Sequence, residues 1–159
     1  MKVREIMTNR IPRVRADADL QQAAETVALS GASDLMVVNE KGQLVGVISA
    51  GDILRACLPK IDDILAEGGS LDQAFALVLK MGRELSRQPM APLMITEPIT
   101  LDPDDHVAKV AVTLVQTNIH SLPVVRDGRL LGLVTRATIL ETVVGSLHSV
   151  PLESRTPAA

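Results

Sequence analysis

The chain has 159 residues, of which 47% are hydrophobic and 22% are charged, and its formal net charge is −3. This composition predicts a packed globular protein, and the lack of a basic excess argues against nucleic acid as a partner. The single cysteine, Cys57, excludes an internal disulfide framework, and the apolar residues around it indicate a buried small side chain rather than a nucleophile.

Signals for export or membrane insertion are absent from the sequence pattern. No apolar segment approaches the roughly 20 residues that span a bilayer. Lys2, Arg4 and Glu5 are not followed by the apolar run of a secretory signal. We therefore expect a cytoplasmic protein without membrane insertion.

Residues 1–58 predict a unit of the order β-α-β-β-α. Its expected elements are an extended segment at 11–14, a helix that Asp19 and Gln22 open as a capping box, apolar runs at 35–38 and 44–48, and a helix from near Gly51. Two apolar runs around a glycine-containing turn are typical of a β-hairpin. A unit this small buries little apolar surface by itself, so it needs a second unit to pack against.

Residues 59–90 predict a linker with a helix of its own. Ser70 and Gln73 have capping-box form, and the apolar stripe that follows predicts a helix through about Ser86. The stripe consists of Leu71, Phe75, Val78, Gly82 and Leu85, backed by Ala74 and Met81. Two roles are open for this helix. It covers a flank of its own chain, which is the commoner case, or it binds a second subunit or a target protein.

Residues 91–150 repeat the first unit in the same order. The matching pairs are Ile6-Met7 with Leu93-Met94, 35–38 with 122–125, Gly46–Ser49 with Gly132–Thr135, and Ile53-Leu54 with Ile139-Leu140. This internal repeat predicts a second β-α-β-β-α unit, with an opening strand at 98–101 and a last helix from near Ala137. The two units are expected to pack sheet against sheet. Residues 151–159 are expected to form a mobile tail.

The repeated unit resembles the CBS domain. The stretch from Gly46 to Asp52 (GVISAGD) matches the nucleotide-binding pattern of that family, in which a glycine and two apolar residues precede Ser or Thr, two variable residues and Asp. The resemblance covers nearly all of the chain outside the linker helix and the tail. It implies an α+β fold of two tandem CBS units, packed sheet to sheet with pseudo-two-fold symmetry, plus the inserted linker helix.

Ser49 and Asp52 allow two interpretations from their chemistry. Ser49 ends a predicted strand and Asp52 lies in the first turn of the next helix, so the carboxylate could accept two hydrogen bonds from a ribose diol. The same spacing is also a helix cap. The family resemblance favours the ribose role. In the second copy Thr138 stands where Asp is expected, which predicts weaker ribose binding there.

The resemblance further implies two clefts, each built from both copies. The stronger cleft is assigned Ser49 and Asp52 for ribose, Ile99 and Thr100 for adenine, His120 for phosphate, and the neighbouring Ser121, Leu122 and Pro123. The weaker cleft is assigned Pro12, Arg13, Ser33, Thr135, Arg136 and Thr138, and both Arg136 and Arg55 are further candidates for phosphate.

The absence of known catalytic motifs argues against an enzyme. Asp104, Asp105 and His106 could hold a metal ion, but they stand where a helix amino terminus is expected, and we predict no metal site. The resemblance predicts a regulatory module that binds AMP, ADP or ATP, forms a homodimer and signals to a regulated protein. The alternatives are a dimerising scaffold whose clefts no longer bind, or a sensor of another adenosyl ligand such as S-adenosylmethionine or NAD.

Overall fold

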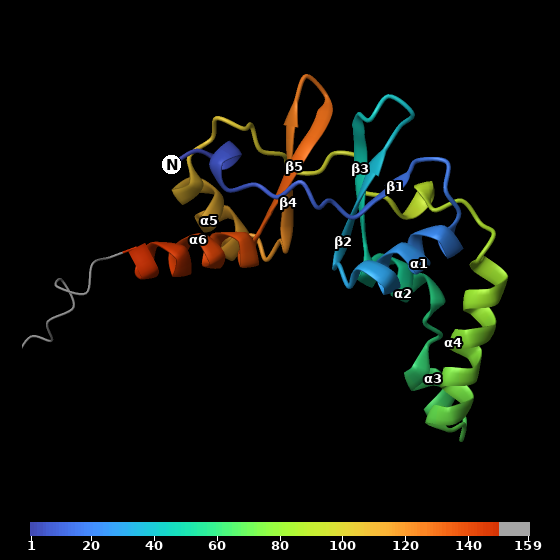
Figure 1. Cartoon of the computed structure of the whole chain (residues 1–159). Helices are drawn as coiled ribbons and strands as arrows, with labels where there is room; N and C mark the ends of the chain where they lie inside the picture. The colour runs from blue at the N-terminus through green and yellow to red at the C-terminus, as the bar shows by residue number, and fades with distance from the viewer. Residues whose placement is uncertain (150–159) are drawn as a thin grey trace, which may run out of the picture. The chain divides into compact units, whose positions relative to one another are not determined.

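The structure is a computed structural model that describes residues 1–149, with side chains described through Leu147, so the predicted tail at 151–159 lies outside the described residues. Two compact units are present, and each is described by itself (Figure 1). Unit 2 is the continuous segment Ile11–Pro98. Unit 1 combines Met1–Arg10 with the segment that begins at Ile99.

Unit 2 contains the predicted β-α-β-β-α order. Its elements are β1 (Arg13–Arg15), α1 (Leu20–Ser30), β2 (Asp34–Val38), β3 (Leu44–Ser49) and α2 (Ala50–Cys57). β1 pairs with β2 in parallel, and β2 pairs with β3 as an antiparallel hairpin. The predicted capping box is confirmed at the start of α1, where the Gln22 amide donates to Asp19 Oδ1 at 2.8 Å and the Asp19 amide donates to Gln22 Oε1 at 3.1 Å.

Unit 1 repeats this order with one difference. Its elements are α5 (Val107–Gln116), β4 (Ser121–Arg126), β5 (Arg129–Thr135) and α6 (Arg136–Ser149), preceded by a 3-10 turn at Val3–Glu5. The β4–β5 hairpin turns at Asp127 and Gly128, whose φ angles of 52° and 77° suit a tight two-residue turn. The predicted strand at 98–101 is wrong, because only Leu101 is paired, in a single parallel bridge to Val124.

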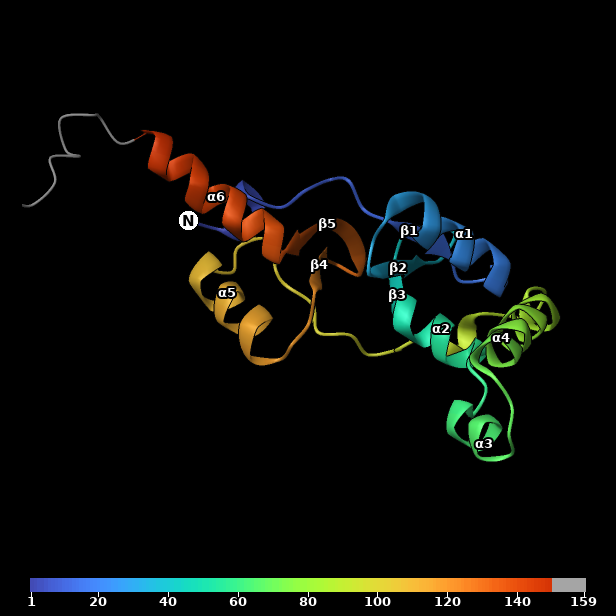
Figure 2. The same cartoon turned by 90° about the horizontal axis from the view of Figure 1, so that it is seen from below.

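The linker folds into two helices within unit 2. α3 (Ile61–Ala66) packs against α4 (Leu71–Leu85), and α4 packs against α2 (Figure 2). Ser70 caps α4 as predicted, since its hydroxyl accepts from the Gln73 amide at 3.2 Å. Within the apolar stripe of α4, Ala74 is buried, whereas Leu71 and Phe75 stay 66% and 62% exposed. The helix therefore covers its own unit along part of the stripe and leaves the amino-terminal part open.

Each unit has its own aliphatic core. The core of unit 2 contains Val14, Ala18, Leu20, Ala23, Leu35, Val37, Ile48 and Met90. The core of unit 1 contains Val3, Leu101, Val110, Leu114, Leu122, Val124 and Val134. Val3 is fully buried although it lies close to the amino terminus, which shows that the first residues of the chain are part of the packing of unit 1.

The first residues of each repeat pack on the hairpin of the other repeat. Thr8 pairs with Leu133 of β5 in unit 1, and Ile95 pairs with Val47 of β3 in unit 2. A buried glycine lies at each crossing. A Cβ on Gly46 would overlap the Met94 side chain and come within 2.6 Å of the Ile95 carbonyl oxygen. The glycine of the sequence motif is thus needed for this close approach.

The compact units therefore differ from the sequence repeat at these two segments. The repeat boundaries follow the chain order, 1–58 and 91–150, while the packing assigns Met1–Arg10 to the second repeat and the segment around Met94 to the first. Among the described helices, none has the length and apolar character that a membrane span needs.

Candidate functional site

Ser49 and Asp52 form a reciprocal cap at the start of α2. The Asp52 amide donates to Ser49 Oγ at 3.0 Å, and the Ser49 amide donates to Asp52 Oδ2 at 3.1 Å. The Ser49 hydroxyl donates to the same Oδ2 at 2.7 Å. β3 ends at Ser49 and α2 begins one residue later, so strand and helix together fix both side chains. The capping interpretation is therefore realised in this structure.

The second carboxylate oxygen of Asp52 faces a movable partner. Oδ1 accepts from the Arg55 guanidinium one helical turn away, and the Arg55 side chain is 69% exposed while that of Asp52 is 21% exposed. Exposed ion pairs of this kind contribute about 0–1 kcal/mol, so a ligand can displace Arg55 at low cost. Oδ1 is then the acceptor that remains open to a diol.

The charge of Asp52 is stabilised by these contacts. Burial alone would raise the pKa of the Asp52 carboxyl, but hydrogen bonds from Ser49 and Arg55 outweigh it, and the pKa lies below its usual value. Asp52 is therefore an ionised acceptor at neutral pH. An ionised acceptor makes stronger hydrogen bonds to hydroxyl groups than a neutral one does.

The second copy has the same cap without the charge. The Thr138 amide donates to Thr135 Oγ1 at 3.1 Å, the Thr135 amide donates to Thr138 Oγ1 at 3.3 Å, and the two hydroxyl oxygens are 3.0 Å apart. Thr138 is only 7% exposed. Its hydroxyl is thus committed to Thr135, and no carboxylate is present to receive a diol.

The other predicted site residues divide between the units. Pro12, Arg13 and Ser33 lie in unit 2 with Ser49 and Asp52, whereas Ile99, Thr100, His120, Ser121, Leu122, Pro123, Thr135, Arg136 and Thr138 lie in unit 1. Neither predicted set is contained within one unit.

Local hydrogen bonds tie several of these residues together within a unit. In unit 2 the Ala50 amide donates to the Ser33 carbonyl at 2.8 Å, and the Met36 amide donates to the Pro12 carbonyl at 2.9 Å. In unit 1 the Leu101 amide donates to the Pro123 carbonyl at 2.9 Å, just after Ile99 and Thr100. The Ala50 and Asp52 amides at the start of α2 are already engaged, so neither is free to bind a phosphate.

Arg136 has a structural task that sequence reasoning did not identify. Its guanidinium donates to the Leu114 carbonyl at the end of α5 at 3.0 and 3.3 Å, and to Asn118 Oδ1 at 3.3 Å. A cation at a helix carboxyl terminus satisfies free carbonyls and interacts favourably with the helix dipole. These contacts favour a helix-capping role over phosphate binding. A long-range partner of this kind leaves no mark in the sequence near Arg136.

The acidic residues before α5 also act structurally. Asp104 pairs with Lys2, Arg4 and Arg126, while Asp105 accepts from the Asp102 amide at 2.9 Å. His106 is the amino-terminal cap of α5, because its Nδ1 accepts from the Ala108 amide at 3.2 Å. The three side chains considered for a metal ion therefore serve separate local contacts.

Two units with this element order, each with a cap where the second strand of its hairpin leads into a helix, define a tandem pair of small α+β domains. The CBS domain family model matches the chain at residues 3–59 and 90–145. The chain belongs to the CBS domain family. The matched residues include both caps and both hairpins, and the predicted α+β fold of tandem CBS units is confirmed.

Individual relatives support the same assignment. Protein MJ1225 of Methanocaldococcus jannaschii is 27% identical over 87% of this chain, which spans 41% of that relative. The structure of MJ1225, whose description proposes an archaeal homologue of g-AMPK, superposes with a TM-score of 0.70 at 22% identity, over 92% of this chain and 51% of that one.

Two similar structures carry adenosyl ligands. CBSX2 of Arabidopsis thaliana in complex with AMP has a TM-score of 0.69 and 23% identity. The CBS domain pair of protein MJ0100, in complex with 5′-methylthioadenosine and S-adenosyl-L-methionine, has a TM-score of 0.64 and 24% identity. Each alignment covers 92% of this chain and 98% of the other. At this level of identity the likeness establishes the fold.

Proposed function

We propose that this protein is a non-catalytic regulatory module that binds an adenine nucleotide, AMP, ADP or ATP, with Asp52 as the acceptor for its ribose hydroxyls. The observation that carries the proposal is the charge and the hydrogen bonding of the Asp52 carboxylate. Its carboxylate is ionised, one oxygen is anchored by Ser49, and the other is held only by the exposed Arg55. A diol that displaces Arg55 meets an acceptor already fixed in position.

The comparisons support an adenosyl ligand. CBSX2 was solved with AMP, and the MJ0100 domain pair with S-adenosyl-L-methionine and 5′-methylthioadenosine. We assign adenine contacts to Ile99 and Thr100 and a phosphate contact to His120, following the family resemblance. We expect ribose binding at the second cleft to be weaker, because the neutral Thr138 stands there in place of an aspartate. A ligand that binds one conformation of the protein better than another shifts the population toward it, and this shift is the proposed signal to a regulated protein.

The experiment is isothermal titration of the whole chain with AMP, ATP and S-adenosylmethionine. Asp52→Asn removes the charge and keeps the shape of the cap, and Asp63→Asn, in the first turn of α3, is the matched control. Hydrogen bonds to charged groups contribute about 1.5–3 kcal/mol, so Asp52→Asn is expected to weaken nucleotide binding roughly tenfold or more. Asp63→Asn is expected to leave the affinity unchanged.

The outcomes separate the candidate functions. Saturable nucleotide binding that depends on Asp52 supports the proposal. If S-adenosylmethionine binds in preference to both nucleotides, the proposed site is retained, but its ligand is S-adenosylmethionine rather than a nucleotide. No binding of any adenosyl ligand contradicts the proposal and favours a scaffold.

We also propose a homodimer formed through the helices of unit 1. α5 and α6, which pack against each other, expose a group of apolar side chains, and exposed apolar patches are typical of interaction surfaces. The group consists of Val112, Val115, Leu140, Val143 and Leu147. Light scattering on the wild type and on Leu140→Glu tests it. A wild-type dimer that the substitution dissociates supports this interface, and an unchanged mass in the variant contradicts it.

A further inference from the structure

The last helix of each repeat leaves an apolar crevice against the first helix. In unit 1 the crevice has a volume of about 220 Å³ and is lined by Ala111, Leu114, Val115, Arg136, Ile139 and Leu140. The equivalent residues of unit 2, Ala24, Val27, Ala28, Ala50, Ile53 and Leu54, line a much larger hollow of about 720 Å³. The repeat therefore provides a shallow apolar crevice in both units, and unit 2 has enlarged it.

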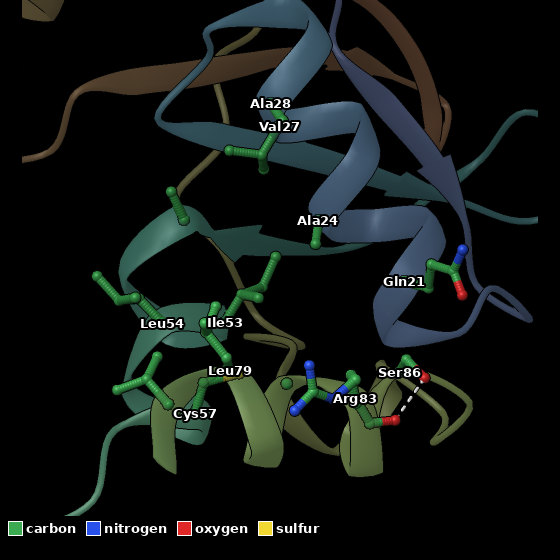
Figure 3. Close-up of a pocket in the computed structure, with 13 residues that line it drawn as sticks. Gln21, Ala24, Val27, Ala28, Ile53, Leu54, Cys57, Leu79, Arg83 and Ser86 are labelled. Atoms are coloured by element: carbon green, nitrogen blue, oxygen red, sulfur yellow. Dashed lines mark hydrogen bonds between the residues drawn. The ribbon is translucent and has the colours of Figure 1, made fainter. Parts of the chain in front are cut away.

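The enlargement comes from α4. This helix adds Val78, Leu79, Gly82, Arg83 and Ser86 as a third wall, opposite α1 and beside α2 (Figure 3). Gly82 has no side chain, and no atom lies within 4 Å of the position where its Cβ would stand. The space above this part of α4 is thus open rather than filled. The volume lies in the range of about 300–1,000 Å³ that is usual for small-molecule sites.

Three polar side chains line this groove, namely Arg83 and Ser86 of α4 and Gln21 of α1. The guanidinium of Arg83 lies over α4 on the side of Leu79, whereas Ser86 and Gln21 lie on the other side of Arg83 (Figure 3). Ser86 donates to the Arg83 carbonyl at 2.8 Å, and Gln21 donates to Glu25, so both have partners of their own. Among the described residues, no acceptor forms a hydrogen bond or ion pair with the Arg83 guanidinium.

The rest of the lining is apolar. Ala24, Val27 and Ala28 of α1 face Ile53, Leu54 and Cys57 of α2 and Leu79 of α4. The groove therefore has an aliphatic lining and one unpaired cation on its α4 wall. A ligand that complements both features carries a flexible hydrocarbon chain and a single terminal anion.

We propose that the groove between α1, α2 and α4 binds a medium-chain aliphatic carboxylate, whose chain lies along α1 and α2 and whose carboxylate pairs with Arg83. The guanidinium has the fork geometry that accepts a carboxylate through two hydrogen bonds. A nucleotide fits this groove poorly, because the lining offers one cation for several phosphate charges and no carboxylate to receive a ribose diol. The site is thus separate from the Ser49 and Asp52 cap and does not depend on nucleotide binding.

The test is isothermal titration of the whole chain with butyrate, octanoate and decanoate below their micelle concentrations, and with decanol as the uncharged analogue. Full burial of a methylene group strengthens binding roughly fourfold, so affinity is expected to rise with chain length by up to that factor per methylene. Decanoate is expected to bind at one site per chain, because the unit 1 crevice lacks the third wall. Arg83→Gln is expected to weaken decanoate roughly tenfold or more and to leave decanol unchanged.

Arg87→Gln is the matched control, since this exposed arginine follows α4 and does not line the groove. Ala24→Leu, which fills the groove from α1, is expected to weaken both decanoate and decanol. The proposal is overturned if decanoate does not bind saturably, if decanol binds as tightly as decanoate, or if Arg83→Gln and Arg87→Gln have equal effects. Because AMP titration of Arg83→Gln reports on the Asp52 site separately, failure of one proposal is distinguishable from failure of the other.

Discussion

Gly46→Ala tests whether the crossing of the chain over β3 is as tight as the structure shows. The new Cβ would lie 2.6 Å from the Ile95 carbonyl oxygen and would overlap the Met94 side chain. The Met94 side chain can rotate away, but the Ile95 carbonyl cannot move freely. It accepts from the Val47 amide at 3.0 Å, and the Ile95 amide donates back to Val47 at 2.8 Å.

Gly132→Ala is the control that the internal repeat supplies. The three atoms nearest to its Cβ would all belong to the side chain of Met7, with the sulfur at 2.7 Å, Cγ at 2.9 Å and Cβ at 3.1 Å. Neither glycine has a positive φ angle, so alanine fits both backbones. Replacing glycine restricts the unfolded chain and favours folding by about 0.4–1 kcal/mol at each site. At Gly132 this gain offsets the movement of a flexible side chain.

At Gly46 the overlap with backbone dominates. Inserting a methyl group into a packed site costs about 1–3 kcal/mol, and a weakened Val47–Ile95 bridge adds up to about 1 kcal/mol. After the gain in the unfolded state, we expect Gly46→Ala to destabilise the protein by about 1–3 kcal/mol and Gly132→Ala by less than about 1 kcal/mol. Urea unfolding followed by circular dichroism measures both. Equal losses in the two variants, or a larger loss for Gly132→Ala, would refute the reasoning.

Two further predictions concern unit 1. Hydrogen bonds from Lys2 and Arg126, together with the charge of Arg4, lower the pKa of Asp104 to about 2, so its contribution to stability is complete above about pH 4 and is lost as the pH falls through about 2. An NMR titration of the Asp104 carboxyl carbon is expected to show this pKa in the wild type and a higher pKa in Arg126→Gln. An unchanged pKa in the variant would contradict the assigned contact between Arg126 and Asp104. Leu114→Ala is expected to cost about 2–5 kcal/mol in urea unfolding, because Leu114 is 1% exposed. The matched Leu29→Ala in α1, at a residue that is 89% exposed and outside the proposed interface, is expected to change stability by less than about 0.5 kcal/mol, and similar losses for both would contradict the assigned core.

Elements whose cause is local could be predicted from the sequence. The capping pairs Asp19 with Gln22 and Ser70 with Gln73 fixed the starts of two helices, because a cap involves residues only three apart. The hairpins followed from apolar runs on either side of a turn. The predicted starts of α2 near Gly51 and of α6 near Ala137 are each one residue later than the structure shows.

Features that depend on distant partners could not be predicted in this way. The opening strand predicted at 98–101 in unit 1 shrinks to a single bridge between Leu101 and Val124. His106 rather than an aspartate caps α5, because Asp105 is engaged by the Asp102 amide. Arg136 reaches the end of α5 across a gap in sequence that no local pattern spans. The pairing of Thr8 with β5 and of Ile95 with β3 is equally non-local.

At the candidate site the sequence identified the reactive group but not its surroundings. The spacing of Ser49 and Asp52 was consistent with a cap and with a ribose acceptor, and the structure shows the cap, with Oδ1 paired with the exposed Arg55. Arg55 was considered for phosphate, and in the structure its first partner is Asp52.

The assignment of Met1–Arg10 to unit 1 makes unit 2 an insertion within unit 1. A gene cut in the linker yields two polypeptides that each lack the segment which completes their own hairpin. Each half carries instead the segment that belongs to the other. Such halves are mutually dependent, so they are suited to a split-protein reporter in which neither piece is complete until the two associate.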